Sequence, residues 1–178
     1  MTNRADIVIV LITSLIISAQ SLADDQRGFV VSAGFGISQI EDDDGDQTFS
    51  GDDTGWHADV EYRVGSHFSA GLGFFSLGTV EDTVDGTATT IDADGVTLFA
   101  RGILPLNETI EGFLRIGSAT YSAIVQPGAF DLDSALEIGV GLDIRTSEKL
   151  AIRLETRFFN GDDDESARLT TVGLRYQF

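Results

Sequence analysis

Two histidines, His57 and His67, are the side chains of this chain best suited to proton transfer near neutral pH, because an unperturbed imidazole titrates there. A hydrolytic site would add a serine and an acid within reach of one imidazole. Neither histidine has both at an evident partner spacing. The chain has no cysteine, which excludes a Cys/His metal cluster and a disulfide framework. We therefore predict a protein that is not an enzyme and that has no resident cofactor.

The other chemically interesting charges lie in segments where polar and apolar residues alternate, which is the period of a β-strand with two unlike faces. In the clearest segment, Trp56, Val60 and Tyr62 alternate with Asp59 and Glu61. Helical periodicity is not evident. The pattern predicts eight strands, at residues 29–38, 56–64, 68–80, 95–104, 111–121, 136–144, 150–158 and 171–178.

The predicted connections fall into two classes that alternate along the chain. Short ones lie at residues 65–67, 106–109 and 146–149, and long ones at 41–54, 81–94, 122–133 and 160–165. An up-and-down meander places all short turns at one rim and all long loops at the other, as in outer-membrane barrels. We predict an all-β fold, an eight-stranded antiparallel up-and-down transmembrane β-barrel.

The polar face of these strands carries arginines and carboxylates in equal number, although the whole chain has 29 acids and 11 bases. It is also rich in Gly and Ser, as the narrow interior of an eight-stranded barrel requires. Isolated charges in such an interior are costly, whereas paired ones are tolerable. We predict a luminal ion-pair network that plugs the barrel; beside Glu111, the polar face holds Asp59, Glu61, Arg63, Arg101, Arg115, Glu137, Asp143, Arg153, Glu155, Arg157 and Arg175.

Aromatic residues on the apolar face concentrate near the strand ends. Two girdles at the headgroup levels of a membrane would give this distribution. The girdle at the short-turn rim would comprise Phe29, Tyr62, Phe68, Tyr176 and Phe178, and that at the long-loop rim Trp56, Phe74 and Phe158.

The N-terminus has the pattern of a secretory signal peptide. Arg4 precedes an apolar run, and the small residues Ser21 and Ala23 precede Asp24. We predict a signal peptide over residues 1–23, a barrel domain over 24–178, and export to the outer membrane.

The long loops carry seven, five, two and four acids, eighteen in all, and no Lys or Arg, so they account for the formal charge of −18. Plain solvation or a saline habitat would explain this charge. Weakly bound divalent cations are the alternative, although the spacing is not that of an EF-hand. The charge opposes nucleic-acid binding. The candidate metal ligands are Asp42, Asp43, Asp44, Asp46, Asp162, Asp163 and Asp164.

The chain ends in alternating apolar residues and a terminal Phe, with Gly173, Leu174, Tyr176 and Phe178 as its main features. This ending resembles the signal that the barrel-assembly machinery recognises in outer-membrane proteins. The stretch Phe99 to Tyr121, with its Leu104-Pro105-Leu106 turn, and Leu154-Glu155 look like the OmpA-like, or outer-membrane β-barrel, family in its short, barrel-only form.

The resemblance implies that the partners are outer-membrane lipid, lipopolysaccharide and the assembly machinery, and that the barrel is a monomer. We expect a structural or surface-interaction role. Two alternatives stay open: a small passive porin-like channel, and a soluble periplasmic lipocalin-like lipid carrier, in which the apolar face would point inward. Some eight-stranded barrels are lipid A deacylases with a His-Ser-Glu arrangement, which His57 and His67 do not match.

Overall fold

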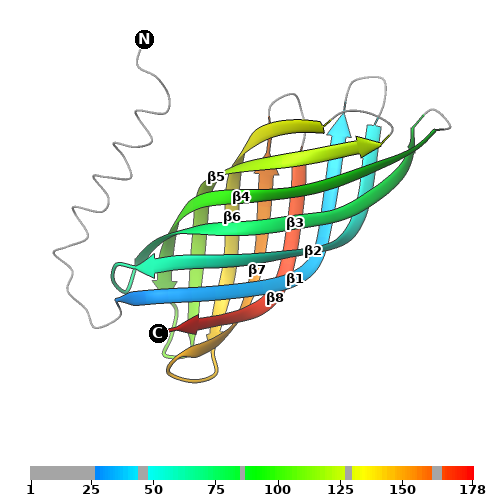
Figure 1. The fold of residues 1–178 in the computed structure, drawn as a ribbon. Coiled ribbons are helices and arrows are strands. Elements are labelled where there is room, and N and C mark those ends of the chain that lie inside the picture. The colour runs from blue at the N-terminus through cyan, green and yellow to red at the C-terminus, as the bar shows by residue number, and fades with distance from the viewer. Residues whose placement is uncertain (1–26, 44–47, 85–86, 127–129, 162–165) are drawn as a thin grey trace, which may run out of the picture.

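The computed structural model describes residues 27–43, 48–84, 87–126, 130–161 and 166–178. Each strand pairs with its neighbours in the sequence, and β1 also pairs with β8, so that the sheet closes into an antiparallel barrel (Figure 1). The predicted fold class is confirmed. The strands are β1 (Gly28–Asp43), β2 (Thr48–Arg63), β3 (Phe68–Val84), β4 (Thr87–Pro105), β5 (Ile110–Gln126), β6 (Phe130–Arg145), β7 (Leu150–Asn160) and β8 (Ser166–Gln177).

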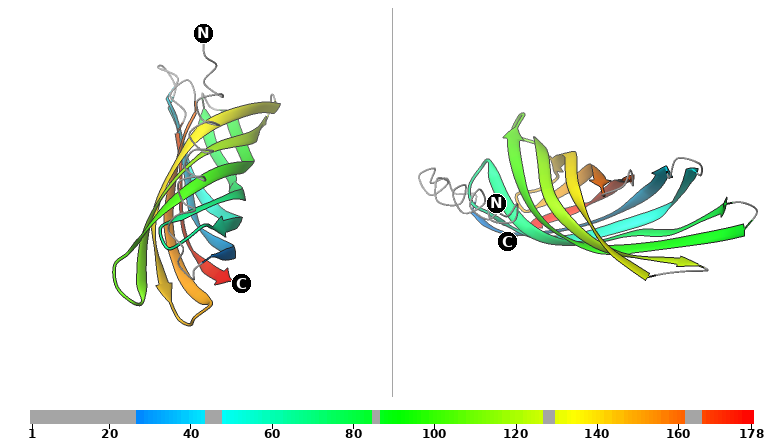
Figure 2. Two further views of the ribbon diagram at one scale, coloured as in Figure 1. Left: turned by 90° about the vertical axis from the view of Figure 1, so that its left-hand side faces the viewer. Right: turned by 90° about the horizontal axis from the view of Figure 1, so that it is seen from above.

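The predicted long loops over residues 41–54, 81–94 and 122–133 are wrong in extent, because strands continue through most of them. The hairpin of β3 and β4 stays paired as far as Val84 and Thr87, and that of β1 and β2 as far as Asp43 and Thr48. The hydrogen bonds between two antiparallel strands join backbone groups, so pairing can continue through residues whose side chains are polar. Figures 1 and 2 show the hairpin of β3 and β4 extending beyond the barrel at the end opposite the C-terminus.

The side chains alternate between the lumen and the outside, as in β7, where exposed and buried residues follow one another. Among the residues that the structure describes, twenty-seven large apolar side chains are exposed, including Leu72 at 60%, Leu114 at 66% and Leu174 at 55%. A water-soluble monomer rarely exposes an apolar surface of this extent, whereas a bilayer core favours it. The lipocalin-like alternative is therefore wrong, since the apolar face points outward. None of the described residues forms a helix long and apolar enough to cross a membrane.

Beyond Trp56 and Ser76 the pairing of β2 with β3 ends, and β3 has a register irregularity between Ser76 and Thr79. Gly78 lies there with φ of 76°, a conformation that other L-residues rarely adopt. The Asp53 carboxylate accepts a hydrogen bond from the backbone N–H of Thr79 at 2.7 Å. The side chain of Asp53 thus satisfies a backbone donor at the place where the two hairpins separate.

The barrel closes where Gly36 of β1 faces the backbone of β8. A methyl group at this position would meet the Thr170 carbonyl oxygen, with Thr171 Cα at 2.8 Å, and neither backbone atom can move without breaking the ladder. At Gly102 a methyl group would meet nothing within 4 Å.

We expect Gly36→Ala to lower the free energy of unfolding by about 1–3 kcal/mol, because the added methyl group overpacks the seam. Gly102→Ala should change it by less than about 0.5 kcal/mol. Urea unfolding of the purified protein in lipid vesicles measures both. Equal midpoints for the two variants would show that the seam is not closed as described.

Candidate functional site

Within the described part of the chain, six arginines and six carboxylates project into the lumen, and all twelve side chains are buried. They come from six of the eight strands, and their formal charges cancel. Every residue of the predicted luminal set is among them. The twelve are Asp59, Glu61 and Arg63 of β2, Arg101 of β4, Glu111 and Arg115 of β5, Glu137 and Asp143 of β6, Arg153, Glu155 and Arg157 of β7, and Arg175 of β8.

At mid-lumen, Asp59 accepts hydrogen bonds from two arginines on the far wall. Arg157 Nη2 lies 2.6 Å from Asp59 Oδ2, and Arg115 Nη1 lies 3.1 Å from the same oxygen. Arg115 Nε is also 2.9 Å from Glu137, and Arg157 Nη2 is 2.9 Å from Glu155. Because neighbouring ion pairs share partners, the layer acts as one network rather than as separate pairs.

Nearer the short turns, Arg153 donates both Nε and Nη2 to the two oxygens of Asp143, each at 2.7 Å. This two-pronged arrangement is the strong geometry of a guanidinium with a carboxylate. Arg101 Nη1 lies 2.6 Å from Glu61 Oε1, and Arg175 Nε lies 3.5 Å from Asp143.

Arg63 closes the lumen at the short-turn rim. Its guanidinium donates to Glu111 at 2.9 and 3.1 Å and to the backbone carbonyl oxygens of Gly65 and Ser66 at 3.1 and 2.9 Å. Glu111 also accepts from Arg145, which is half-buried at the turn between β6 and β7. These bonds tie the β2–β3 turn to the opposite wall.

Glycines lie directly across the ladder from the large luminal side chains. Asp59 faces Gly73, Glu137 faces Gly117, and Arg153 faces Gly173. Because an eight-stranded barrel has little interior volume, a glycine on the neighbouring strand leaves room for each of these side chains. This pairing explains why the polar face is rich in glycine.

Aromatic rings line the arginine layer. The Arg115 guanidinium carbon lies 3.5 Å from the ring centre of Phe99, and that of Arg101 lies 4.4 Å from the ring centre of Phe113. Such contacts are favourable for a desolvated cation. Phe99 and Phe113 therefore pack against the arginines, and because the rings are uncharged, the lumen stays neutral.

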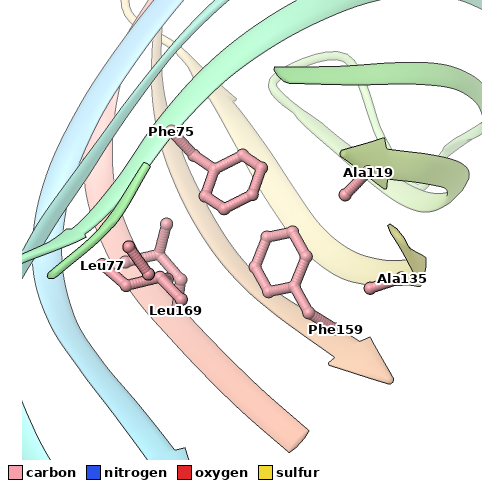
Figure 3. Packing of buried hydrophobic residues seen from close by; sticks show 7 residues of the cluster. Phe75, Leu77, Ala119, Ala135, Phe159 and Leu169 are labelled. Carbon is pink, nitrogen blue, oxygen red and sulfur yellow. The ribbon is translucent and has the colours of Figure 1, made fainter. Parts of the chain in front are cut away.

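Above the charged layers, at the long-connection end, the lumen is filled by apolar side chains. Figure 3 shows Phe75 of β3 stacked on Phe159 of β7, with Leu77 and Leu169 beside them, and the ring centres are 4.6 Å apart. Ala119 and Ala135 complete this side of the cluster. We call these six residues the apolar layer; Ala93 also belongs to the same buried cluster.

His57, Asp59 and Glu155 bring three possible ligand atoms within 4.8 Å of one another, which is close enough to hold a metal ion. Arg157 Nη2, however, lies 2.8 Å from His57 Nδ1 and within hydrogen-bond distance of both carboxylates. A guanidinium nitrogen thus already occupies the position between the three groups. These residues fit an arginine and do not fit a metal ion in addition.

His67 lies in the β2–β3 turn, where its Nδ1 is 2.6 Å from Ser66 Oγ, and both residues are at the surface. Among the described residues, no ion pair joins His67 to a carboxylate. Within the described ranges, His57 has two carboxylate neighbours and contacts no serine. The two imidazoles lie on opposite sides of the charged layers and do not form one arrangement.

The predicted girdle residues all lie on the outside of the barrel. At the short-turn rim, Phe29 contacts Tyr62 edge to face at 5.2 Å, and Tyr176 contacts Phe178 at 5.1 Å; Phe68 is 41% exposed. At the other rim, Trp56, Phe74 and Phe158 are exposed, and Phe35, which the prediction missed, is 65% exposed.

The residues of the predicted assembly signal lie on and just after β8. Leu174 and Tyr176 point outward, and Gly173 leaves room for the backbone of Ala33 in β1. The backbone N–H of Phe178 donates to the Phe29 carbonyl oxygen at 3.0 Å. The last residue therefore takes part in the seam between β1 and β8.

Two predictions fall outside the described residues. The signal peptide over residues 1–23 is one. The other is the set of candidate cation ligands: Asp44, Asp46 and Asp162 to Asp164 are not described, and Asp42 and Asp43 are described only as backbone of β1.

Residues 8–178 match the family described as the outer membrane protein beta-barrel domain. The chain belongs to this family. It is therefore an outer-membrane β-barrel protein with buried ion pairs in its interior, and the predicted resemblance is confirmed. No curated protein sequence matches the chain.

Solved structures with the same fold are distant in sequence. The attachment invasion locus protein Ail of Yersinia pestis, in complex with the heparin analogue sucrose octasulfate, has a TM-score of 0.60 and 14% identity over 86% of this chain and 99% of that one. Neisserial surface protein A has 0.63 and 12% over 85% and 97%. OprG of Pseudomonas aeruginosa has 0.62 and 12% over 86% and 97%. At such identities the likeness shows the fold alone.

The sequence did not reveal the role of His57 in the network or the apolar layer. Gly71, Gly73 and Phe75 occupy alternate positions of β3, and Arg157 and Phe159 occupy alternate positions of β7. Alternation of the lumen-facing residues therefore predicts that both rings lie inside the barrel. The predicted lumen contains the ion-pair network, and neither Phe75 nor Phe159 is assigned to it.

We expect Asp143→Asn and Arg153→Met each to lower the free energy of unfolding by about 3–5 kcal/mol, because each leaves a buried charge without its main partner. The double variant should cost less than the sum of the single changes. Urea unfolding in lipid vesicles measures this coupling. Glu148→Gln, in the exposed turn nearby, is the control and should change stability by less than about 0.5 kcal/mol. Additive single effects would show that the two side chains do not interact.

Proposed function

We propose that this barrel is a structural and surface-interaction protein of the outer membrane, that its lumen is closed, and that its acidic connections face the outside. The observation that carries the proposal is the filled lumen, in which the apolar layer lies over a neutral network of twelve charged side chains. A signal peptide over residues 1–23 and assembly by the barrel-assembly machinery belong to the same proposal.

Two properties of the network support a plug. The charges balance, so the lumen carries no net charge that would concentrate ions of one sign. Breaking one buried pair costs about 3–5 kcal/mol, so a path for water needs several expensive rearrangements. The stacked rings of Phe75 and Phe159 add a region in which an ion would find no polar partner.

A passive channel is the second candidate, and one observation favours it. Glu155 Oε1 lies 3.9 Å from both Arg101 and Arg115, while Glu155 Oε2 is bonded to Arg157 at 2.9 Å. A carboxylate with several nearby arginines could exchange partners and so admit water. The apolar layer would still have to move.

The surface role rests on charge. The whole excess of −18 resides outside the neutral lumen, and eighteen acids lie in the four connections at one rim. Such a rim favours cationic partners and divalent cations that link carboxylates to lipopolysaccharide phosphates, and it disfavours nucleic acid and polysulfated ligands. We further propose that the barrel is monomeric and has no catalytic activity, since neither histidine has a complete set of catalytic partners among the described residues.

We expect the purified protein to be silent in planar lipid bilayers. Replacing Phe75 and Phe159 by Ala together with Arg115 by Ala should produce discrete current steps, because this triple variant removes both barriers. Steps in the unmodified protein that Arg115→Ala or Glu137→Ala abolishes would instead establish the channel.

We expect deletion of Phe178 to lower the amount of assembled protein in the outer membrane several-fold, because the deletion removes a seam hydrogen bond and the ring packed on Tyr176. Glu165→Gln, a change in the acidic connection before β8, should leave the amount unchanged. Envelope fractionation gives the amount, and faster migration of the unboiled protein on a denaturing gel reports the closed barrel. Equal yields of the two variants would contradict the assembly role of the C-terminus.

A further inference from the structure

One basic side chain stands apart from all the others. The chain has eleven Lys and Arg residues, and all but Arg4 are described. Six point into the lumen, and Arg27, Arg145 and Lys149 lie at the short-turn end. Only Arg168 of β8, among the described bases, points outward at the end with the acidic connections.

Arg168 lies in a small polar patch on the lipid-facing surface. Its ladder neighbours are Gln39 of β1 and Phe158 of β7, and its guanidinium donates to the Gln39 side-chain oxygen. One outward position nearer the membrane centre, the hydroxyls of Thr170 and Thr156 lie 3.2 Å apart; Thr170 is exposed and Thr156 is half-buried. These four polar side chains, Arg168, Gln39, Thr170 and Thr156, form the Arg168 patch.

The apolar band begins at the lower edge of this patch, where Ile37 of β1, 60% exposed, pairs with Thr170. Val172 of β8, Leu154 of β7 and Phe35 of β1 are the next outward positions, and they are 43%, 42% and 65% exposed. Phe158, a residue of the outer girdle, is level with Arg168. The guanidinium is therefore placed at the headgroup level, where an outward arginine costs much less free energy than at the bilayer centre.

We propose that the Arg168 patch binds the phosphate of an outer-leaflet lipid headgroup, with the acyl chains of that lipid lying over Phe35 and Val172. Charge complementarity supports a lipid phosphate as the occupant. Arg168 has no ion-pair partner among the described carboxylates, while the surrounding rim is strongly acidic and would otherwise repel anionic lipids. The proposal rests on the long connections facing outward.

The chemistry of the patch suits a phosphate. A guanidinium presents two parallel N–H donors to two phosphate oxygens. The Thr170 hydroxyl can donate to a third oxygen, because a hydroxyl is both donor and acceptor. Gln39 already accepts one N–H of Arg168, which holds the long side chain against the barrel wall.

The chain supplies its own reporter of a lipid at this place. Trp56 is the only tryptophan, it is 48% exposed, and it pairs with Phe35, two strands from β8. Bromine atoms on the acyl chains of a lipid held at the Arg168 patch would lie close enough to quench its fluorescence.

The experiment measures quenching of Trp56 in vesicles of phosphatidylcholine that contain a small fraction of brominated lipid, either phosphatidic acid or phosphatidylcholine. We expect brominated phosphatidic acid to associate with the unmodified protein about threefold to tenfold better than brominated phosphatidylcholine, as charged hydrogen bonds at an interface allow. Arg168→Gln should abolish this preference, and Arg168→Lys should keep part of it.

The matched control is Lys149→Gln, which removes an exposed cation at the opposite rim and should leave the preference intact. An equal preference in Arg168→Gln and the unmodified protein would overturn the proposal, as would an equal loss in Lys149→Gln. Loss of the preference when inorganic phosphate is added at the lipid-phosphate concentration would assign the patch to free phosphate and overturn the lipid. Absence of quenching by either brominated lipid would contradict membrane embedding itself, which is a failure of the proposed function.

Discussion

The pairing of buried charge inside a narrow barrel is the constraint on which the rest of this structure depends. Six arginines and six carboxylates share a lumen that is too small for bulk water, so each must find its partner on another strand. Arg153 with Asp143 and Arg157 with Asp59 satisfy this need only in one ladder register, because a shift by one residue would turn each of these side chains toward lipid. The network therefore selects the register as well as filling the space.

Steric complementarity follows from the same constraint. Glycine on the neighbouring strand makes room for several of the luminal side chains, as Gly173 does for Arg153 and Gly73 does for Asp59. The outer face of the barrel contacts the membrane instead, and it has aromatic rings at both rims and aliphatic side chains between them. Alternate residues of the same strand thus face two different environments, the charged lumen and the lipid. The lumen selects paired charges and glycines, and the lipid selects apolar side chains.

Much of this was predictable from the sequence, because alternation, connection length and charge balance are local or additive signals. The eight strands, the two faces and the side on which Asp59 or Arg115 lies all follow from a period of two. Individual pairs do not, since Arg115 reaches Asp59 on a strand 56 residues away and nothing in the sequence names that partner. The extent of β3 and β4 was also missed, because backbone pairing in a hairpin continues through polar residues once both strands are present. The Arg168 patch required the ladder, which alone shows that Arg168, Gln39 and Phe158 are neighbours.

The seam between β1 and β8 has a consequence for the order of folding. Seven of the eight strand pairings join neighbours in the chain, and closing each of them costs little loop entropy. The eighth joins the two ends, and contacts such as Arg153 with Ser32 and Arg157 with His57 bridge 121 and 100 residues. Until the seam closes, Arg153 and Arg157 lack these contacts with β1 and β2 and keep only nearby partners such as Asp143 and Glu155. A half-closed sheet is then a high-energy species in a bilayer, so closure and charge pairing occur together, and insertion approaches an all-or-none transition.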